Sequence, residues 1–284
     1  MQMKFPIKIQ FKRRPKAKQD TAALRTRMLL VMLAVAILPL FGFTFYASQQ
    51  LKSSADANLE TSLDQLSELE GTMLDNWTAD RLQDLQLLAV NPYVQSMSST
   101  IIQPTLQEYA DSRQIYESIS IFSTGGKNFA STSSIDLKVS DRQYFQEALE
   151  GKTVISDPLI SRESGKVALV FATPVVSDGK IMAVLAMVVP VETIRDSLSQ
   201  GRLGETGDAF LIDQTGLLVT PSRFADQMLA AGLVKDHSEY EYKLKNDLTA
   251  DLLAGNSGFD KYIDFRGKQV AASYMYIPNL KMGL

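Results

Sequence analysis

Residues 166–189, KVALVFATPVVSDGKIMAVLAMVV, contain two apolar runs that are separated by Asp178-Gly179. An Asp-Gly pair between two such runs is a strong short-range signal of a β-hairpin. The sequence therefore predicts two antiparallel strands, at 166–176 and 180–189. This hairpin is the firmest starting point for the fold, and the neighbouring elements can be worked out on both sides of it.

The residues before the hairpin predict further strands and a short helix. Residues 139–152, VSDRQYFQEALEGK, have the pattern of a helix that Ser140 or Asp141 caps and Gly151 ends. Gly125-Gly126 predicts a tight turn between two alternating runs. The expected strands are 117–123, 127–132 and 153–161, and a helical segment is expected at about 104–115.

A similar order of elements is expected after the hairpin. It comprises a helix at 191–200, short strands at 208–213 and 217–220, a polar helical insert at about 226–253, and a hairpin formed by 258–264 and 269–276. The pattern predicts an α+β fold with two tandem antiparallel-sheet modules of PAS type. The similarity between the two modules lies in their architecture and not in matching residues.

Residues 49–92 predict one long stalk helix, because apolar residues recur at threes, fours and sevens and no proline precedes Pro92. A helix of about 40 residues is roughly 60 Å long at 1.5 Å per residue. Its apolar seam can pack against a second copy of the chain or along the chain's own domain. The seam contains Leu59, Leu63, Leu66, Met73, Trp77, Leu85 and Leu88.

Residues 28–48 contain no charged side chain and are long enough to cross a bilayer as a helix. Residues 1–27 carry nine basic side chains against Asp20 alone, a net charge of +8. A basic tail can bind nucleic acid, but beside an apolar span the positive-inside rule predicts a cytoplasmic N-terminus and an exported remainder. A cleaved signal peptide is the alternative, with a shorter apolar core and a cleavage site after it.

The composition excludes several classes of function. The chain of 284 residues has no Cys and one His, His237, so thiol nucleophiles, disulfide scaffolds and Cys-based or His-based metal sites are not expected. No paired carboxylates, nucleophile elbow or phosphate-binding loop stands out in the sequence. We therefore expect no enzyme in this segment, no cofactor, no metal and no nucleic-acid partner.

The layout resembles the double Cache sensor region of bacterial transmembrane receptors, of the chemoreceptor and sensor histidine kinase type. The segments that carry the resemblance are DRQYFQEALEGKTVIS, GKVALVFATPVV, GETGDAFLIDQTGLLVTP and GFDKYIDFRGKQVAASYMYIP. The resemblance implies a cytoplasmic tail at 1–27, a transmembrane helix at 28–48, the stalk at 49–92, a membrane-distal ligand-binding module at 93–200 and a membrane-proximal module at 201–284. It also implies that a second spanning helix and an output domain follow in the complete receptor.

The same resemblance places a ligand site where Arg142 and Tyr144 begin the helix of the distal module. An Arg offers a carboxylate two parallel hydrogen bonds, and a tyrosine hydroxyl can add a third. Amino-acid sensors of the family have Arg-x-Trp-Tyr here and an acid on the last strand of the module. Residues 181–189 contain no acid, which favours a small organic acid. The predicted ligand-binding residues are Arg142, Tyr144, Ser156, Asp157, Phe171 and Thr173.

Simpler roles for these residues remain open. Arg142 can pair with Asp141 or Asp136 on the surface, and Ser156 and Asp157 can form a turn before Pro158. The two-residue period of a strand places Leu169, Phe171 and Thr173 on one face, where Thr173 can serve the sheet alone.

The predicted function is ligand sensing outside the plasma membrane, with the signal passed along the stalk helix of a homodimer. The rivals are an amino-acid sensor of the same family, a membrane-tethered scaffold or adhesion domain without a small ligand, and a periplasmic hydrolase. The missing output could be a chemotaxis signalling rod, a histidine kinase or a cyclase.

Overall fold

The computed structural model describes residues 19–198 and 204–284. The chain divides into two compact units, one ending at Leu59 and one formed by Glu60–Leu284. Helix α1 (Gln19–Ala89) is continuous through the predicted span and the predicted stalk, with Pro39 inside it. Its N-terminal part is long and apolar enough to cross a membrane by length and composition, and the apolar side chains there are exposed.

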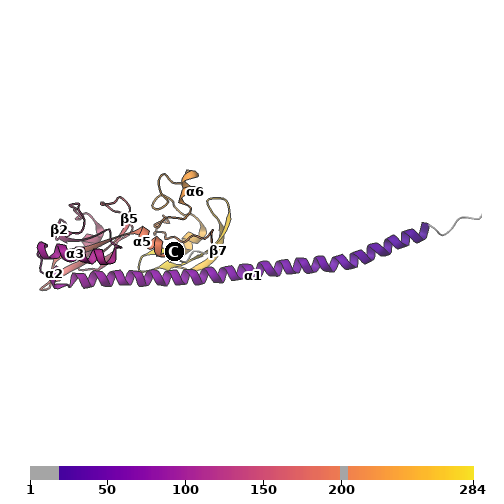
Figure 1. The fold of residues 1–284 in the computed structure, drawn as a ribbon, viewed down its shortest axis with the longest axis horizontal. Coiled ribbons are helices and arrows are strands. Elements are labelled where there is room, and N and C mark those ends of the chain that lie inside the picture. The colour runs from indigo at the N-terminus through magenta and orange to yellow at the C-terminus, as the bar shows by residue number, and fades with distance from the viewer. Residues whose placement is uncertain (1–18, 199–203) are drawn as a thin grey trace, which may run out of the picture. The chain divides into compact units, whose positions relative to one another are not determined.

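The first module of the 60–284 unit is built on an antiparallel sheet (Figure 1). The strand order is β2-β1-β6-β5-β3, and β4 also pairs with β5. The strands are β1 (Ser118–Ser123), β2 (Asn128–Ser131), β3 (Val154–Ile155), β4 (Leu159–Ile160), β5 (Val167–Ser177) and β6 (Lys180–Pro190).

The predicted hairpin at 166–189 is confirmed. Ser177 pairs with Lys180, so Asp178 and Gly179 alone form the turn. Both have positive φ, 49° and 72°, as a two-residue hairpin turn that matches the twist of its strands requires. The hairpin joins the two longest strands of the sheet, β5 and β6.

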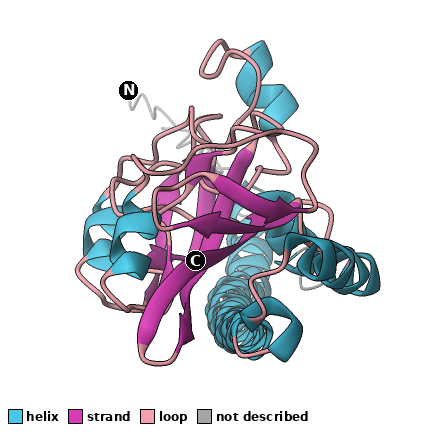
Figure 2. Cartoon of the chain, turned by 90° about the vertical axis from the view of Figure 1, so that its left-hand side faces the viewer, coloured by secondary structure: helices cyan, strands magenta, loops and turns pink. Residues whose placement is uncertain are grey.

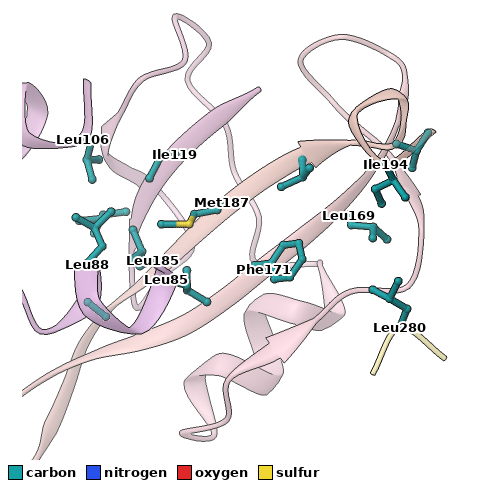
Figure 3. Close-up of a cluster of buried hydrophobic side chains, with 14 of the residues drawn as sticks. Leu85, Leu88, Leu106, Ile119, Leu169, Phe171, Leu185, Met187, Ile194 and Leu280 are labelled. Atoms are coloured by element: carbon teal, nitrogen blue, oxygen red, sulfur yellow. The ribbon is translucent and has the colours of Figure 1, made fainter. Parts of the chain in front are cut away.

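Side chains cover both faces of β5 and β6, which explains why these strands are apolar throughout rather than alternating. On one face Leu169, Phe171, Leu185 and Met187 pack with residues of α1 and of α3 (Ser99–Arg113). Figure 3 shows this cluster, with Phe171 between Leu85 and Leu169.

The opposite face of the sheet packs against helix α4 (Gln143–Leu149). In Figure 2 the sheet lies between a short helix on one side and α1, seen end-on, on the other. The side chains of this second cluster are Phe122, Val139, Tyr144, Phe145, Ala148, Val170, Ala172, Val184 and Ala186. The sheet therefore separates two distinct hydrophobic clusters.

Two predicted elements of the first module differ from the structure. The segment 153–161 forms the two-residue strands β3 and β4 and not one strand, because the hydroxyl of Ser156 accepts the Val170 amide at 2.9 Å in place of a backbone carbonyl. Pro158 follows and has no amide to donate. The helix expected at 104–115 begins earlier, at Ser99, after the short helix α2 (Pro92–Gln95), and Pro104 lies inside it.

The second module contains less regular structure than predicted. In place of the strands expected at 208–213 and 217–220, the structure has isolated bridges that pair Ile212 with Leu218 and Gly283, and Leu217 with Lys243. The expected helical insert is two short helices, α6 (Ala225–Ala230) and α7 (Asp247–Leu253), separated by a loop. The remaining elements are α5 (Val191–Leu198), β7 (Gly258–Ile263), β8 (Gln269–Tyr274), β9 (Tyr276–Ile277) and β10 (Met282–Gly283), and the predicted end of the 191–200 helix lies outside the described residues.

The stalk seam packs, in part, on the chain's own modules. Leu63 and Leu66 are half-buried beside the second module, and Trp77 contacts Phe171 edge to face at 6.0 Å. Leu69 and Met73 of the same helix remain exposed. A stalk-mediated homodimer stays a prediction, and these two exposed residues fit it better than Leu63 and Leu66.

Candidate functional site

The N-terminus of α4 brings two arginines and a carboxylate together. The helix begins at Gln143 with Arg142 as its N-cap residue, and no side chain caps it. The predicted cap by Ser140 or Asp141 is therefore wrong, and Asp141 makes a different contact. Its carboxylate instead binds the Arg162 guanidinium, with nitrogen–oxygen distances of 2.5 and 3.2 Å. Arg162 also donates to the carbonyl of Lys138.

The Arg142 guanidinium is held by a weaker contact. Its Nη2 donates to the backbone carbonyl of Ile160 at 3.3 Å, at the long end of the hydrogen-bond range. Asp141, one of the two surface partners predicted for Arg142, forms its ion pair with Arg162 instead. Arg142 is half-buried, so part of its side chain reaches solvent. Of the two guanidiniums, that of Arg142 is thus the one more easily drawn to a bound anion.

Tyr144 lies beside both arginines and inside the hydrophobic cluster under α4. Burial raises the pKa of its hydroxyl to about 12, an effect that the positive charges of Arg142 and Arg162 partly oppose. The phenol therefore stays neutral at physiological pH and can donate a hydrogen bond. Phe122 and Phe145 belong to the same cluster and pack edge to face, with 6.4 Å between ring centroids. The two guanidiniums therefore lie beside an apolar cluster.

The other four predicted residues have different surroundings. The Ser156 amide and hydroxyl both bond to the backbone of Val170. Asp157 is exposed. Phe171 is fully buried against α1, and the Thr173 hydroxyl lies 2.7 Å from that of Thr153.

The predicted shared face of Leu169, Phe171 and Thr173 exists, but it is the face opposite α4. Leu169 and Phe171 belong to the cluster against α1, whereas Tyr144 belongs to the cluster under α4. The structure therefore brings Arg142 and Tyr144 together and does not bring Phe171 or Thr173 to them. It adds Asp141 and Arg162 instead.

Arg162 is the residue that sequence reasoning missed. It lies in the turn SRESGK between β4 and β5, where a charged side chain is ordinary. Its distance in sequence from Asp141 is 21 residues. The local pattern contains no signal for this pair, which only the pairing of β4 with β5 creates.

The second module contains a cavity of about 270 Å³. It lies between residues 206–212 and β8, and α1 contributes Leu63, Leu66, Ser67 and Glu70 to its wall. The Oε1 atom of Glu70 is buried and has no hydrogen-bond partner in the part of the chain that the structure describes. Burial raises the pKa of this carboxyl to about 7. The sequence assigned no residue to this cavity.

Glu70 gives the fold a pH dependence with a definite sign. The folded protein holds the Glu70 proton up to about pH 7, whereas the unfolded chain releases it near pH 4.5. The free energy of unfolding should therefore fall as pH rises from 4.5 to 7, by roughly 1–3 kcal/mol. Urea unfolding of wild type and Glu70→Gln at pH 5 and pH 8 measures it. The difference between the two proteins should change with pH, and a constant difference would contradict the assignment.

The fold is that of an α+β sensor module, and comparison with known proteins identifies its family. The profile of the Cache domain family dCache_1 matches residues 47–284, so the chain belongs to this family. The methyl-accepting chemotaxis protein PscA of Pseudomonas syringae pv. tomato is 24% identical over 202 residues, which are 67% of this chain and 32% of PscA. The chain thus spans about a third of that protein's length.

Two solved structures share the fold. The ligand-binding domain of the Campylobacter jejuni chemoreceptor Tlp3, in complex with L-valine, has a TM-score of 0.61 at 14% identity, covering 82% of this chain and 93% of that domain. The ligand-binding domain of the Pseudomonas aeruginosa amino acid chemoreceptor PctB, in complex with L-Arg, has a TM-score of 0.58 at 19% identity, covering 80% and 94%.

These findings define the chain as a non-enzymatic sensor domain of the chemoreceptor type, with a ligand-sensing function. The apolar N-terminal helix and the Cache domain are the features of a membrane receptor with an extracellular domain. Within the described residues, no cluster of His, Cys, Asp and Glu is arranged to hold a metal ion.

Proposed function

We propose that the first module binds a small organic acid at the N-terminus of α4, and that Arg142, Arg162 and Tyr144 recognise its carboxylate. The observation that carries the proposal is the convergence of two guanidiniums and a neutral phenol at the rim of an apolar cluster. With Asp141 included, the charged groups sum to +1, which suits one carboxylate. The apolar side chains under α4 would exclude water from the ligand.

The three donors have separate tasks. Arg142 can exchange its 3.3 Å bond to Ile160 for a bidentate bond to the ligand, at little cost. Arg162 is already oriented by Asp141, so it contributes charge from a fixed position. The Tyr144 hydroxyl adds a neutral hydrogen bond.

An organic acid is favoured over an amino acid because the carboxylate beside the two arginines, that of Asp141, is already paired with Arg162. The β6 side chains that pack in the cluster under α4 are Val184, Ala186 and Val188, and none of them is acidic. The amino-acid alternative is supported by the ligands named for Tlp3 and PctB. Their identity to this chain is under 20%, so they share the fold but do not decide the ligand. The ligand screen therefore includes amino acids.

The test is a thermal-shift screen of the protein with monocarboxylates, dicarboxylates and amino acids, followed by calorimetry on variants. Arg142→Ala should weaken binding of the acid that shifts the wild type by roughly 30-fold or more, because a desolvated charge-assisted contact is lost. Arg142→Lys should be nearly as weak, since an ammonium lacks the planar fork. Tyr144→Phe should cost about 1 kcal/mol.

Lys152→Ala is the matched control. Lys152 is an exposed cation just past the end of α4, paired with Glu150, and it should bind as wild type does. If Arg142→Ala binds the acid equally well, the site lies elsewhere. A shift with amino acids alone would favour the amino-acid sensor, and no shift with any metabolite would favour a scaffold or adhesion domain.

We also propose that the N-terminus is cytoplasmic and that the Cache region is exported, on the basis of the basic residues before the apolar part of α1. Alkaline phosphatase fused after Gln50 should be active, because it folds only outside the cytoplasm. A fusion before Arg25 is the control and should be inactive. An inactive enzyme at Gln50, with full expression, would overturn the export of the sensor.

Signal output then requires that the ligand bind one arrangement of the module better than another, since a ligand with equal affinity for both shifts nothing. The α1 helix packs against the opposite face of the same sheet and is the proposed path to the membrane. The likeness to PscA supports a chemotaxis output in the complete receptor.

A further inference from the structure

Strand β4 has an outer edge that points away from the rest of the first sheet. The Ser161 amide donates to the carbonyl of Lys166, next to β5, at 2.8 Å, so Ser161 is directed toward β5. Because successive residues of a strand direct their backbone groups to opposite edges, Pro158 and Ile160 direct their carbonyls away from β5. Among the described residues, no strand pairs with this outer edge.

Two side chains from different modules bind these two carbonyls. Arg142, at the N-terminus of α4, donates to the Ile160 carbonyl at 3.3 Å. The Tyr240 hydroxyl, which belongs to the second module, donates to the Pro158 carbonyl. The edge of β4 is therefore held from one side by an arginine of the proposed acid site and from the other by the second module.

The second module holds Tyr240 in a constrained conformation. Its φ is 62°, an outlier for a bulky side chain that persists only where the surroundings fix it. Its amide donates to the Leu218 carbonyl at 2.7 Å, and the Leu218 amide donates to the Tyr242 carbonyl at 2.9 Å. Burial, followed by the charges of Asp213 and Asp157, raises the pKa of the Tyr240 hydroxyl, so this hydroxyl remains a hydrogen-bond donor.

The segment between these two bonds has little else to hold it. Strand β4 has only the two residues Leu159 and Ile160, and the Ile160 side chain is 43% exposed. Short, exposed segments of this kind open locally at a small cost in free energy. A change in the Arg142 bond therefore alters how firmly β4 is held, whereas the main core of the module is unaffected.

We propose that Tyr240 is a positioning residue for the acid site, and that the outer edge of β4 passes the occupancy of that site to the second module. Release of Arg142 from Ile160 loosens β4, and the change reaches Leu218 through the Tyr240 hydroxyl. The coupling is reciprocal, so the second module also influences how Arg142 is held. The inference rests on the proposed function for the acid that releases Arg142.

Hydrogen exchange on the full chain in detergent tests the link without any ligand, because Arg142→Ala frees the Ile160 carbonyl as a bound acid does. The Ser161 amide reports on β4, and the Leu218 amide reports on the second module. Both should exchange at least about fivefold faster in Arg142→Ala than in wild type, the low end of usual couplings between sites. In a Tyr240→Phe background, Arg142→Ala should still accelerate Ser161 and should leave Leu218 unchanged. A residue that merely stabilises the module would give the same change in both backgrounds.

Tyr274→Phe is the matched control for the loss of a tyrosine hydroxyl. The Tyr274 hydroxyl donates to Asp251 at 2.7 Å, and both residues belong to the second module. In this background Arg142→Ala should still accelerate the Leu218 amide. Lys152→Ala, which removes an exposed cation paired with Glu150, should accelerate neither reporter amide.

The proposal is overturned if Arg142→Ala leaves either the Ser161 or the Leu218 amide unchanged. It is also overturned if Leu218 is accelerated equally with and without the Tyr240 hydroxyl. Should Tyr240→Phe fail to fold, Tyr240→His replaces it, because histidine tolerates positive φ and its ring is too short to reach Pro158. Calorimetry measures acid binding separately, so a failure of this link and a failure of the acid site are distinguishable.

Discussion

Phe171→Ala should lower the free energy of unfolding by about 3–5 kcal/mol, the cost of removing a large ring from a packed core. The ring is completely buried between the sheet and α1 and contacts Trp77 edge to face, with 6.0 Å between centroids. Neighbouring side chains are held by two rigid elements, so they cannot collapse into the space. The loss should therefore be near the upper part of that range.

Trp77 is the single tryptophan of the sequence, so its fluorescence reports the unfolding of this core directly. The measurement is urea unfolding of the protein in detergent. Val176→Ala is the control, because Val176 lies on the same strand but is 41% exposed, and it should cost less than about 1 kcal/mol. Since Phe171 lies on the face opposite Arg142, folded Phe171→Ala should still bind the acid. A cost equal to that of Val176→Ala would show that the cluster against α1 is not the main core.

Asp84→Asn should destabilise the protein by about 3 kcal/mol or more, because it removes the only carboxylate that compensates a buried arginine among the described residues. Asp84 and Arg81 are less than 10% exposed, and their side chains approach to 3.2 Å. Asp84 also accepts bonds from Arg113 at 3.0 Å and from the Tyr116 hydroxyl at 3.1 Å. An asparagine keeps one acceptor oxygen but replaces the other with an NH2 group, which faces donors that need an acceptor.

Arg113→Ala is the matched control for this network. The Arg113 side chain is 46% exposed, so it can be lost to solvent at a cost below about 1 kcal/mol. The same urea titration compares the two variants. Equal costs for Asp84→Asn and Arg113→Ala would mean that the Arg81–Asp84 pair contributes little, and that α1 is held to the first module by apolar contacts alone.

Local chemistry was enough to predict the elements with strong signals. Asp178-Gly179 predicts the turn because both positions require positive φ, and the structure has 49° and 72° there. The apolar run without charges predicts the exposed N-terminal part of α1 in the same way. Such features depend on neighbours in sequence, so no distant residue can change them.

Elements with competing partners were predicted less well. Asp141 has the chemistry of a helix cap, but the Arg162 guanidinium, distant in sequence, forms a charge-assisted pair with it instead. Residues 153–161 have the composition of a strand, but Ser156 bonds to Val170 with its side chain and breaks the ladder. In both cases a contact from another element outweighs the local preference.

The sequence by itself determined the α+β class, the long apolar helix and its basic flank, the β5–β6 hairpin and the resemblance to the Cache family. It also determined that Leu169 and Phe171 share a face, because alternation is a property of the strand backbone. Only the tertiary structure decided that α1 covers this face while α4 and Tyr144 cover the other. It likewise decided that Arg162 joins Asp141, and that residues of α1 and β8 line the cavity of the second module. Periodicity fixes which residues point the same way, whereas the layer that they meet depends on long-range packing.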